Sequence, residues 1–269
     1  MCLGRRPAHG CAMNITTAPT SPTTHDTTTR PGRGRRAALV GASVLTCALP
    51  LMWTANITRM LLTGVDSEHR FHQATGQGLI LLAFWLGALI PLIRSGWRGE
   101  RPSTTAGLRH LTLLLGGVVC AAVAPRGGAP ALLVVIAVGG GLLWWALPVR
   151  PRLRSAVQVD PVLLPASLVL AACLLPYAAD QLSLQNAATG YHSHNPHFFD
   201  MAWISVVLVA QAVLAALLPA ARSLALPVGL ATVVLGTAGL AFGEATGQAW
   251  IAVAVGLGVA AAHLVRARR

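Results

Sequence analysis

Residues 199–218 read FDMAWISVVLVAQAVLAALL, and Asp200 is the only residue in this stretch that carries a charge. A helix that crosses the hydrocarbon core of a bilayer needs about 20 mostly apolar residues. In lipid the backbone must satisfy its own hydrogen bonds, so a helix is the structure that such a segment adopts. The stretch therefore predicts a membrane-spanning helix.

The composition extends this prediction to the whole chain. Of its 269 residues, 54% are hydrophobic and only 10% are charged, whereas an ordinary soluble domain carries about 25% charged residues. A chain so poor in charge cannot cover a globule with a polar surface, so we expect the lipid bilayer to be its main partner. Abundant Ala, Gly, Val and Leu, with Arg as the basic residue, are typical of a GC-rich bacterial genome.

Eight segments are apolar enough to span a membrane. They lie at 37–56, 74–93, 107–124, 129–148, 161–180, 199–218, 223–242 and 247–265. We predict an all-α polytopic transmembrane protein of about eight spans in two four-helix halves, 37–155 and 156–269. The polar residues 1–36 are expected to form a disordered cytoplasmic tail.

Arginine is distributed unevenly among the predicted loops. With the N-terminus inside, 17 of the 20 basic residues fall in inner segments. Because basic residues favour the cytoplasmic side, we predict a multi-pass cell-membrane protein with both termini in the cytoplasm. The net charge of +12 then faces anionic lipid headgroups, so no nucleic-acid partner is expected.

Two polar segments place histidines just ahead of predicted outer helix starts. Residues 66–77 read DSEHRFHQATGQ and residues 191–203 read YHSHNPHFFDMAW. In the second segment Asn195 is a good N-cap and Pro196 suits the first helical position. His197 and Asp200, three residues apart, then share a helix face.

The first segment can start a helix in the same way if Ser67 is its N-cap. His69 then takes the place of His197, and His72 takes the place of Asp200. Imidazole and carboxylate suit a transition metal ion, and two histidines from facing helices can also ligate a haem iron. The candidate cofactor ligands are His69, His72, His194 and His197, and Glu68 and Asp200 are further candidate metal ligands.

Other interpretations of these residues stay open at this stage. The histidines would also suit a pH-responsive or structural polar cluster, or proton transfer and acid catalysis without a metal. The candidate functions are a redox or redox-assembly protein, a small-solute or ion transporter, and a non-catalytic accessory subunit with a membrane-protein partner or a homo-oligomeric state. Whether the chain is an enzyme is not predicted. His110 and His263 stand beside arginines at cytoplasmic helix ends, where we expect interfacial positions.

The layout of four plus four spans resembles that of the haem A synthase family. The residues that carry this resemblance are SEHRFHQ at 67–73, around the second span, and His197 at the sixth. That family also has histidines at the outer ends of its fourth and eighth spans. Here the fourth span has none, and His263 lies at the opposite end of the eighth, so membership is not predicted.

Overall fold

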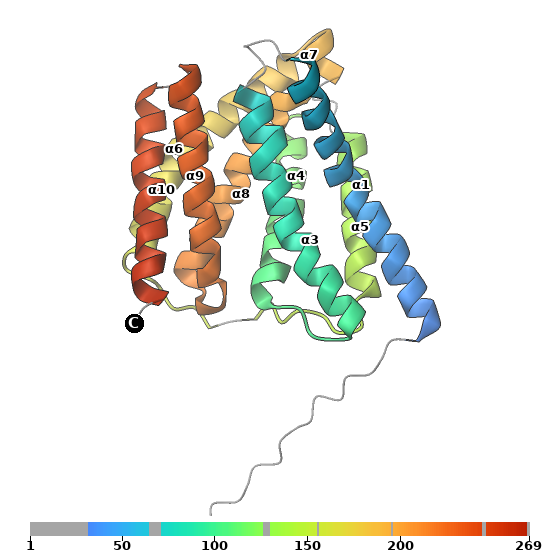
Figure 1. Ribbon diagram of the computed structural model, residues 1–269. Helices are drawn as coiled ribbons and strands as arrows, with labels where there is room; N and C mark the ends of the chain where they lie inside the picture. Colours follow the sequence, from blue (N-terminus) through green and yellow to red (C-terminus); the bar gives the residue numbers. More distant parts are fainter. Residues whose placement is uncertain are drawn as a thin grey trace, which may run out of the picture.

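The computed structural model describes residues 32–64, 71–125, 130–154, 156–194, 196–243 and 246–267. Throughout these residues the regular structure is helical (Figure 1). The elements are α1 (Arg33–Thr63), η1 (His72–Ile80), α3 (Leu81–Arg98), α4 (Thr104–Val123), α5 (Pro130–Ala146), α6 (Leu163–Ala187), α7 (Tyr191–His194), α8 (His197–Leu217), η2 (Pro219–Leu224), α9 (Ala225–Phe242) and α10 (Thr246–Ala267).

Seven of the described helices are long and apolar enough to cross a membrane, so the chain is a multi-pass helical membrane protein. The predicted span at 129–148 corresponds to α5, which has 17 residues. At 1.5 Å per residue such a helix is about 26 Å long, a little less than the ~30 Å hydrocarbon core. The prediction of eight spans is therefore not confirmed.

Helix α1 is longer at both ends than the first predicted span. The tail was expected to reach residue 36, but α1 already begins at Arg33, while residues 1–31 lie outside the described part. The first span was expected to end near residue 56, but α1 continues to Thr63.

Helix α8 lies at the centre of the bundle. Its span is 72% buried, more than any other candidate span. It contacts α6, α4, η1 and α9, and it buries Phe199, Met201 and Trp203 completely. The indole N–H of Trp203 donates to the carbonyl oxygen of Leu113 on α4 at 2.8 Å.

Helices α9 and α10 approach each other closely because both carry glycine at their contact. A Cβ on Gly236 would lie 2.7 Å from the carbonyl oxygen of Ala249, and one on Gly229 would lie 2.7 Å from that of Gly256. Small residues at such contacts let helices pack in lipid, where the hydrophobic effect does not drive helices together.

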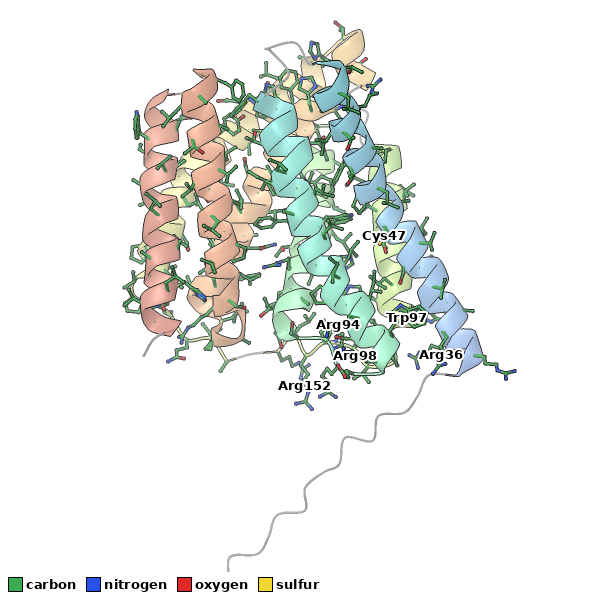
Figure 2. All side chains as sticks on the ribbon, viewed as in Figure 1. Arg36, Cys47, Arg94, Trp97, Arg98 and Arg152 are labelled. Atoms are coloured by element: carbon green, nitrogen blue, oxygen red, sulfur yellow. The ribbon has the colours of Figure 1, made fainter. Side chains whose placement is uncertain are left out.

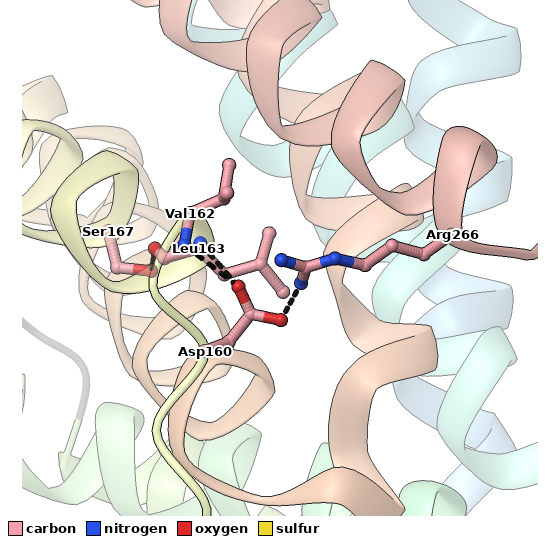
Figure 3. A network of polar contacts seen from close by, with 5 residues as sticks. All are labelled: Asp160, Val162, Leu163, Ser167 and Arg266. Carbon is pink, nitrogen blue, oxygen red and sulfur yellow. Dashed lines mark hydrogen bonds and ion pairs between the residues drawn. The ribbon is translucent and has the colours of Figure 1, made fainter.

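Figure 2 shows Arg36, Arg94, Arg98 and Arg152 at the end of the bundle where α1 begins, which we call the arginine end. Asp160 joins three elements at the loop that leads into α6 (Figure 3). Its Oδ1 accepts the backbone N–H groups of Val162 and Leu163, and its Oδ2 forms an ion pair with Arg266 of α10. Its backbone N–H donates to the carbonyl oxygen of Ala216 on α8, so the loop ties α6, α8 and α10 together.

Candidate functional site

The candidate site lies at the histidine end, where η1 and α8 begin, opposite the arginine end. Helix α8 begins at His197 with Pro196 as its N-cap residue. The sequence prediction had Asn195 as the cap and Pro196 as the first helical residue; Asn195 lies outside the described residues. The short helix α7 precedes this start and carries His192 and His194.

The register between η1 and α8 is set by a glycine. A Cβ on Gly76 would collide with the sulfur of Met201 unless that side chain shifted, so glycine at this position lets Met201 pack directly against the backbone of η1. His72 lies four residues before Gly76, and His197 lies four residues before Met201. One helical turn from the contact, their rings therefore meet at the histidine end.

Three imidazole rings lie together here. The ring centres of His72 and His197 are 5.2 Å apart, and those of His192 and His197 are 4.9 Å apart. His72 is 9% exposed and His197 is 1% exposed. The ring of Phe198 contacts all three imidazoles. We call His72, His192 and His197 the histidine cluster.

A buried carboxyl group stands on the same helix as His197: Asp200 follows it by three residues on α8 and is 1% exposed. Gln185 of α6 fixes the backbone on both sides of His197. Its Nε2 donates to the carbonyl oxygen of His192 at 3.0 Å, and its Oε1 accepts the backbone N–H of Phe199 at 3.2 Å. The end of α6 therefore holds α7 and the start of α8 in place.

The structure places some of the predicted ligands and leaves others outside its described part. It brings together His72 and His197, with Asp200 on the same helix as His197. His194 lies in α7, but its side chain is not among those described, and Glu68 and His69 fall outside the described residues. The expected equivalence of His72 with Asp200 depended on Ser67 as the helix cap, and Ser67 lies outside the described residues.

The sequence candidates omitted two residues that build this site, His192 and Gln185. The signal for His192 was its position on the same polar segment as His194 and His197. Gln185 was recognisable in the sequence only as a polar residue near the outer end of the fifth span, because its role depends on how α6 packs against α8.

The cluster can be tested against the two expected cofactors. Axial histidines of a haem stand on opposite faces of the porphyrin, whereas the rings of His72 and His197 contact each other directly. The pair does not fit haem. Among the described residues, no group of three or more His, Cys, Asp or Glu side chains is already arranged to hold a metal ion.

Another buried histidine, His110, lies inside the bundle away from the cluster. His110 on α4 is 0% exposed, and its Nδ1 accepts the indole N–H of Trp144 on α5 at 2.8 Å. The ring of Trp85 on α3 lies against its other side, with ring centres 5.8 Å apart. The predicted interfacial position of His110 is therefore wrong: three helices enclose it.

Helix α8 adds a polar contact of its own to α4. Gln211, which is fully buried, donates from Nε2 to the hydroxyl oxygen of Thr112 at 2.9 Å. Polar side chains thus occur at two depths of the bundle, the histidine cluster at one end and His110 with Gln211 nearer the arginine end.

No protein-family model, curated protein or solved structure matches this chain.

Proposed function

We propose that this chain is a bacterial plasma-membrane protein that binds a transition metal ion at its histidine cluster, in a redox role or in the assembly of a redox complex. The observation that carries the proposal is the meeting of His72, His192 and His197 from three separate elements, with the rings of His72 and His197 buried. Imidazole is a favoured ligand of zinc, copper, iron and nickel.

The spacing of the rings supports this choice. Metal–nitrogen bonds of 2.0–2.1 Å and tetrahedral angles place the centres of two ligating imidazoles about 5 Å apart. The observed separations of 5.2 Å and 4.9 Å agree with that value. The rings contact one another at oblique angles, so ligation requires them to turn on their side-chain bonds. Asp200 would complete the set, together with Glu68, His69 or His194.

Elemental analysis of the purified protein tests the proposal. The protein is dialysed against zinc, copper or iron, washed, and its bound metal is compared between the wild type, His197→Ala and His263→Ala. We expect about one ion per chain in the wild type and in His263→Ala, whose histidine is half-buried on α10, and a loss of most of it in His197→Ala. Equal metal content in all three proteins, or none in the wild type, would contradict the proposal.

The proposed topology has eight spans in two halves, 37–155 and 156–269, with the arginine end and both termini in the cytoplasm. The helix contacts support the two halves. In the first, α1 contacts α3 and α5, and α4 contacts the same two helices; in the second, α6 contacts α8 and α10, and α9 contacts the same two. Each half is therefore a closed ring of four helices in the same order.

The orientation is tested by labelling intact cells with a membrane-impermeant maleimide, in a background without Cys2 and Cys11. Leu62→Cys, near the end of α1, is expected to react in intact cells, because Leu62 is 82% exposed at the histidine end. Arg152→Cys, at the arginine end, is expected to react only after the cells are opened. The reverse pattern would invert the topology.

A second candidate function is transport of a small solute or ion, and one observation favours it. His110 and Gln211 are buried polar groups within spans, where such groups are costly and tend to mark a pathway. Uptake into proteoliposomes that is lost in both His197→Ala and His110→Ala would support transport. Metal binding without uptake would leave the first proposal alone.

A further inference from the structure

A pocket lies at the arginine end, between the first turn of α1 and the last turn of α5. Its volume is about 340 Å³, it is partly open, and Gly34, Arg35 and Trp145 line it. Pockets that bind small ligands have volumes of about 300–1,000 Å³. The lining joins a guanidinium group to an indole ring, so a ligand in this pocket meets a positive charge and an aromatic surface together.

The guanidinium group of Arg35 is held in place by the neighbouring helix. Its Nη2 donates to the carbonyl oxygen of Leu147, just after the end of α5, at 3.0 Å. A guanidinium group has five N–H donors, so others remain for a further acceptor. Arg35 is exposed, and within the described part of the chain no carboxylate pairs with it.

Three segments converge beside this pocket. A Cβ on Gly96 of α3 would lie 3.0 Å from the side chain of Leu39 on α1 and 3.1 Å from that of Leu147. Arg35 stands four residues before Leu39, so it lies on the same face of α1, one turn nearer the end of the bundle. The close packing at Gly96 therefore fixes the spacing between the start of α1 and the residues that follow α5.

Positive charge surrounds the pocket. Residues 32–36, 94–101 and 145–154 contain nine arginines and a single acidic residue, Glu100. Figure 2 shows four of these arginines gathered at the arginine end together with a tryptophan: Arg36, Arg94, Arg98, Arg152 and Trp97. An anion is therefore the complementary ligand.

Two tryptophans set the depth of the pocket in the bilayer. Trp97, in the last turn of α3, is 50% exposed, and Trp145, in the last turn of α5, is 62% exposed. Tryptophan is enriched at the level of the lipid headgroups, so Arg35 stands where the phosphate groups of one leaflet lie. A lipid also covers the exposed indole ring of Trp145 with its hydrocarbon, which a small soluble anion does not.

We propose that this pocket binds one anionic phospholipid, whose phosphate accepts hydrogen bonds from Arg35 and whose acyl chains cover Trp145. Arginine pairs with phosphate through two parallel N–H···O bonds, and basic pockets between transmembrane helices bind anionic headgroups. A zwitterionic lipid brings an ammonium group that the surrounding arginines repel. The site is separate from the histidine cluster, and the inference does not depend on a metal ion there.

Native mass spectrometry of the full chain, delipidated in detergent, tests the inference. The two probes are dioleoylphosphatidylglycerol and dioleoylphosphatidylethanolamine, which differ only in the headgroup. We expect one molecule of the phosphatidylglycerol to bind the wild type more tightly than any further molecule, and more tightly than the phosphatidylethanolamine. Equal affinity of the two lipids would overturn the inference.

Arg35→Gln and Arg152→Gln separate a built site from diffuse attraction. Both remove one positive charge from the arginine end, but Arg152 does not line the pocket. We expect the first phosphatidylglycerol to bind about tenfold more weakly in Arg35→Gln, which corresponds to the loss of one hydrogen bond to a charged group, and nearly as in the wild type in Arg152→Gln. The same loss in both variants would show that only the overall charge attracts the lipid.

A second pair of variants tests the pocket without changing Arg35. A Cβ on either Gly34 or Gly41 of α1 meets no atom within 4 Å, so Gly34→Phe and Gly41→Phe are both expected to fold, which thermal unfolding without lipid checks. Only Gly34 lines the pocket, so only Gly34→Phe should weaken binding of the phosphatidylglycerol. Equal affinity in the two variants would contradict the inference.

A soluble competitor distinguishes a lipid from a free phosphate compound. Glycerol 3-phosphate carries the phosphate of the headgroup but no acyl chain to cover Trp145. We expect it to leave the bound phosphatidylglycerol in place when it is added at the same concentration as the lipid. Displacement of the lipid under these conditions would assign the pocket to a soluble phosphate compound and overturn the lipid site.

Discussion

Substitution of Asp160 tests whether one carboxyl group fastens the second half of the bundle at the arginine end. In the structure this buried side chain caps α6 through Val162 and Leu163 and pairs with Arg266 of α10 (Figure 3). Asp160→Ala removes both functions. Asp160→Asn keeps an amide oxygen that can accept the same backbone N–H groups and removes only the charge.

The expected free energies of unfolding follow from these contacts. Loss of a helix N-cap costs about 1 kcal/mol and up to about 2. The ion pair adds about 1 kcal/mol, because the side chain of Arg266 is 35% exposed and solvent weakens its attraction. We therefore expect Asp160→Ala to cost about 2–3 kcal/mol and Asp160→Asn about 1 kcal/mol.

Thermal unfolding in detergent, followed by tryptophan fluorescence, measures these differences. For a chain of this size each kcal/mol corresponds to about 2–4 °C in Tm. Arg266→Gln should cost about as much as Asp160→Asn, and the double variant should cost no more than either alone, since both remove the same pair. Ser103→Ala, which removes the cap of α4 at Ala106, is the control for a cap without an ion pair. This reasoning would be refuted if the losses of unfolding free energy in Asp160→Asn and Arg266→Gln added up in the double variant. It would also be refuted if Asp160→Asn and Asp160→Ala lost the same amount.

Two further predictions concern packing inside the bundle. Trp144→Phe removes the donor to His110 and leaves a buried ring nitrogen unsatisfied. The free energy of unfolding should therefore fall by about 1–3 kcal/mol. Trp145→Phe, at an exposed position, is the control and should change the free energy of unfolding by less than about 0.5 kcal/mol. Gly236→Ala places a methyl group 2.7 Å from a backbone oxygen of α10, so it should destabilise the protein by about 1–3 kcal/mol. The methyl group of Gly141→Ala meets no atom within 4 Å, so this variant should stabilise the protein by about 0.5–1 kcal/mol. Both pairs are compared by thermal unfolding; a sign opposite to the one stated in either glycine variant would contradict the packing described here.

The sequence predicted where the helices lie better than where they end. The stretch 199–218 corresponds closely to α8 (His197–Leu217), because an apolar run marks the part of a helix that replaces water with lipid or protein. Helix α1 extends seven residues beyond its prediction, since the hydroxyl groups of Thr58 and Thr63 donate to carbonyl oxygens one turn earlier and are satisfied within the helix. Helix α6 likewise runs on to Ala187, because Gln181 and Gln185 are buried within the bundle.

The way in which the histidines meet could not be predicted from their spacing. Spacing from presumed caps could not reveal that residues 72–80 form a π-helix, which turns each side chain to a direction that an α-helical pattern does not give. The close contact of Gly76 with Met201 then selects His72 as the partner of His197. The burial of His110 could not be predicted either, because it depends on α3 and α5 closing over it, and both contacts join residues far apart in the sequence.

The arrangement along α8 favours binding over transport as the role of the histidine cluster. His197 and Gln211 lie fourteen residues apart, about 21 Å along the helix axis at 1.5 Å per residue. Between them Trp203 is fully buried and packs against Trp53 and Trp85, with ring centres 6.3 Å and 6.0 Å away. These three indole rings lie in contact between His197 and Gln211, so passage of a solute along α8 from one to the other would require the rings to separate. The imidazole rings of the cluster, by contrast, already lie within 5.2 Å of one another at one end of the bundle, so binding there does not require passage between the two ends.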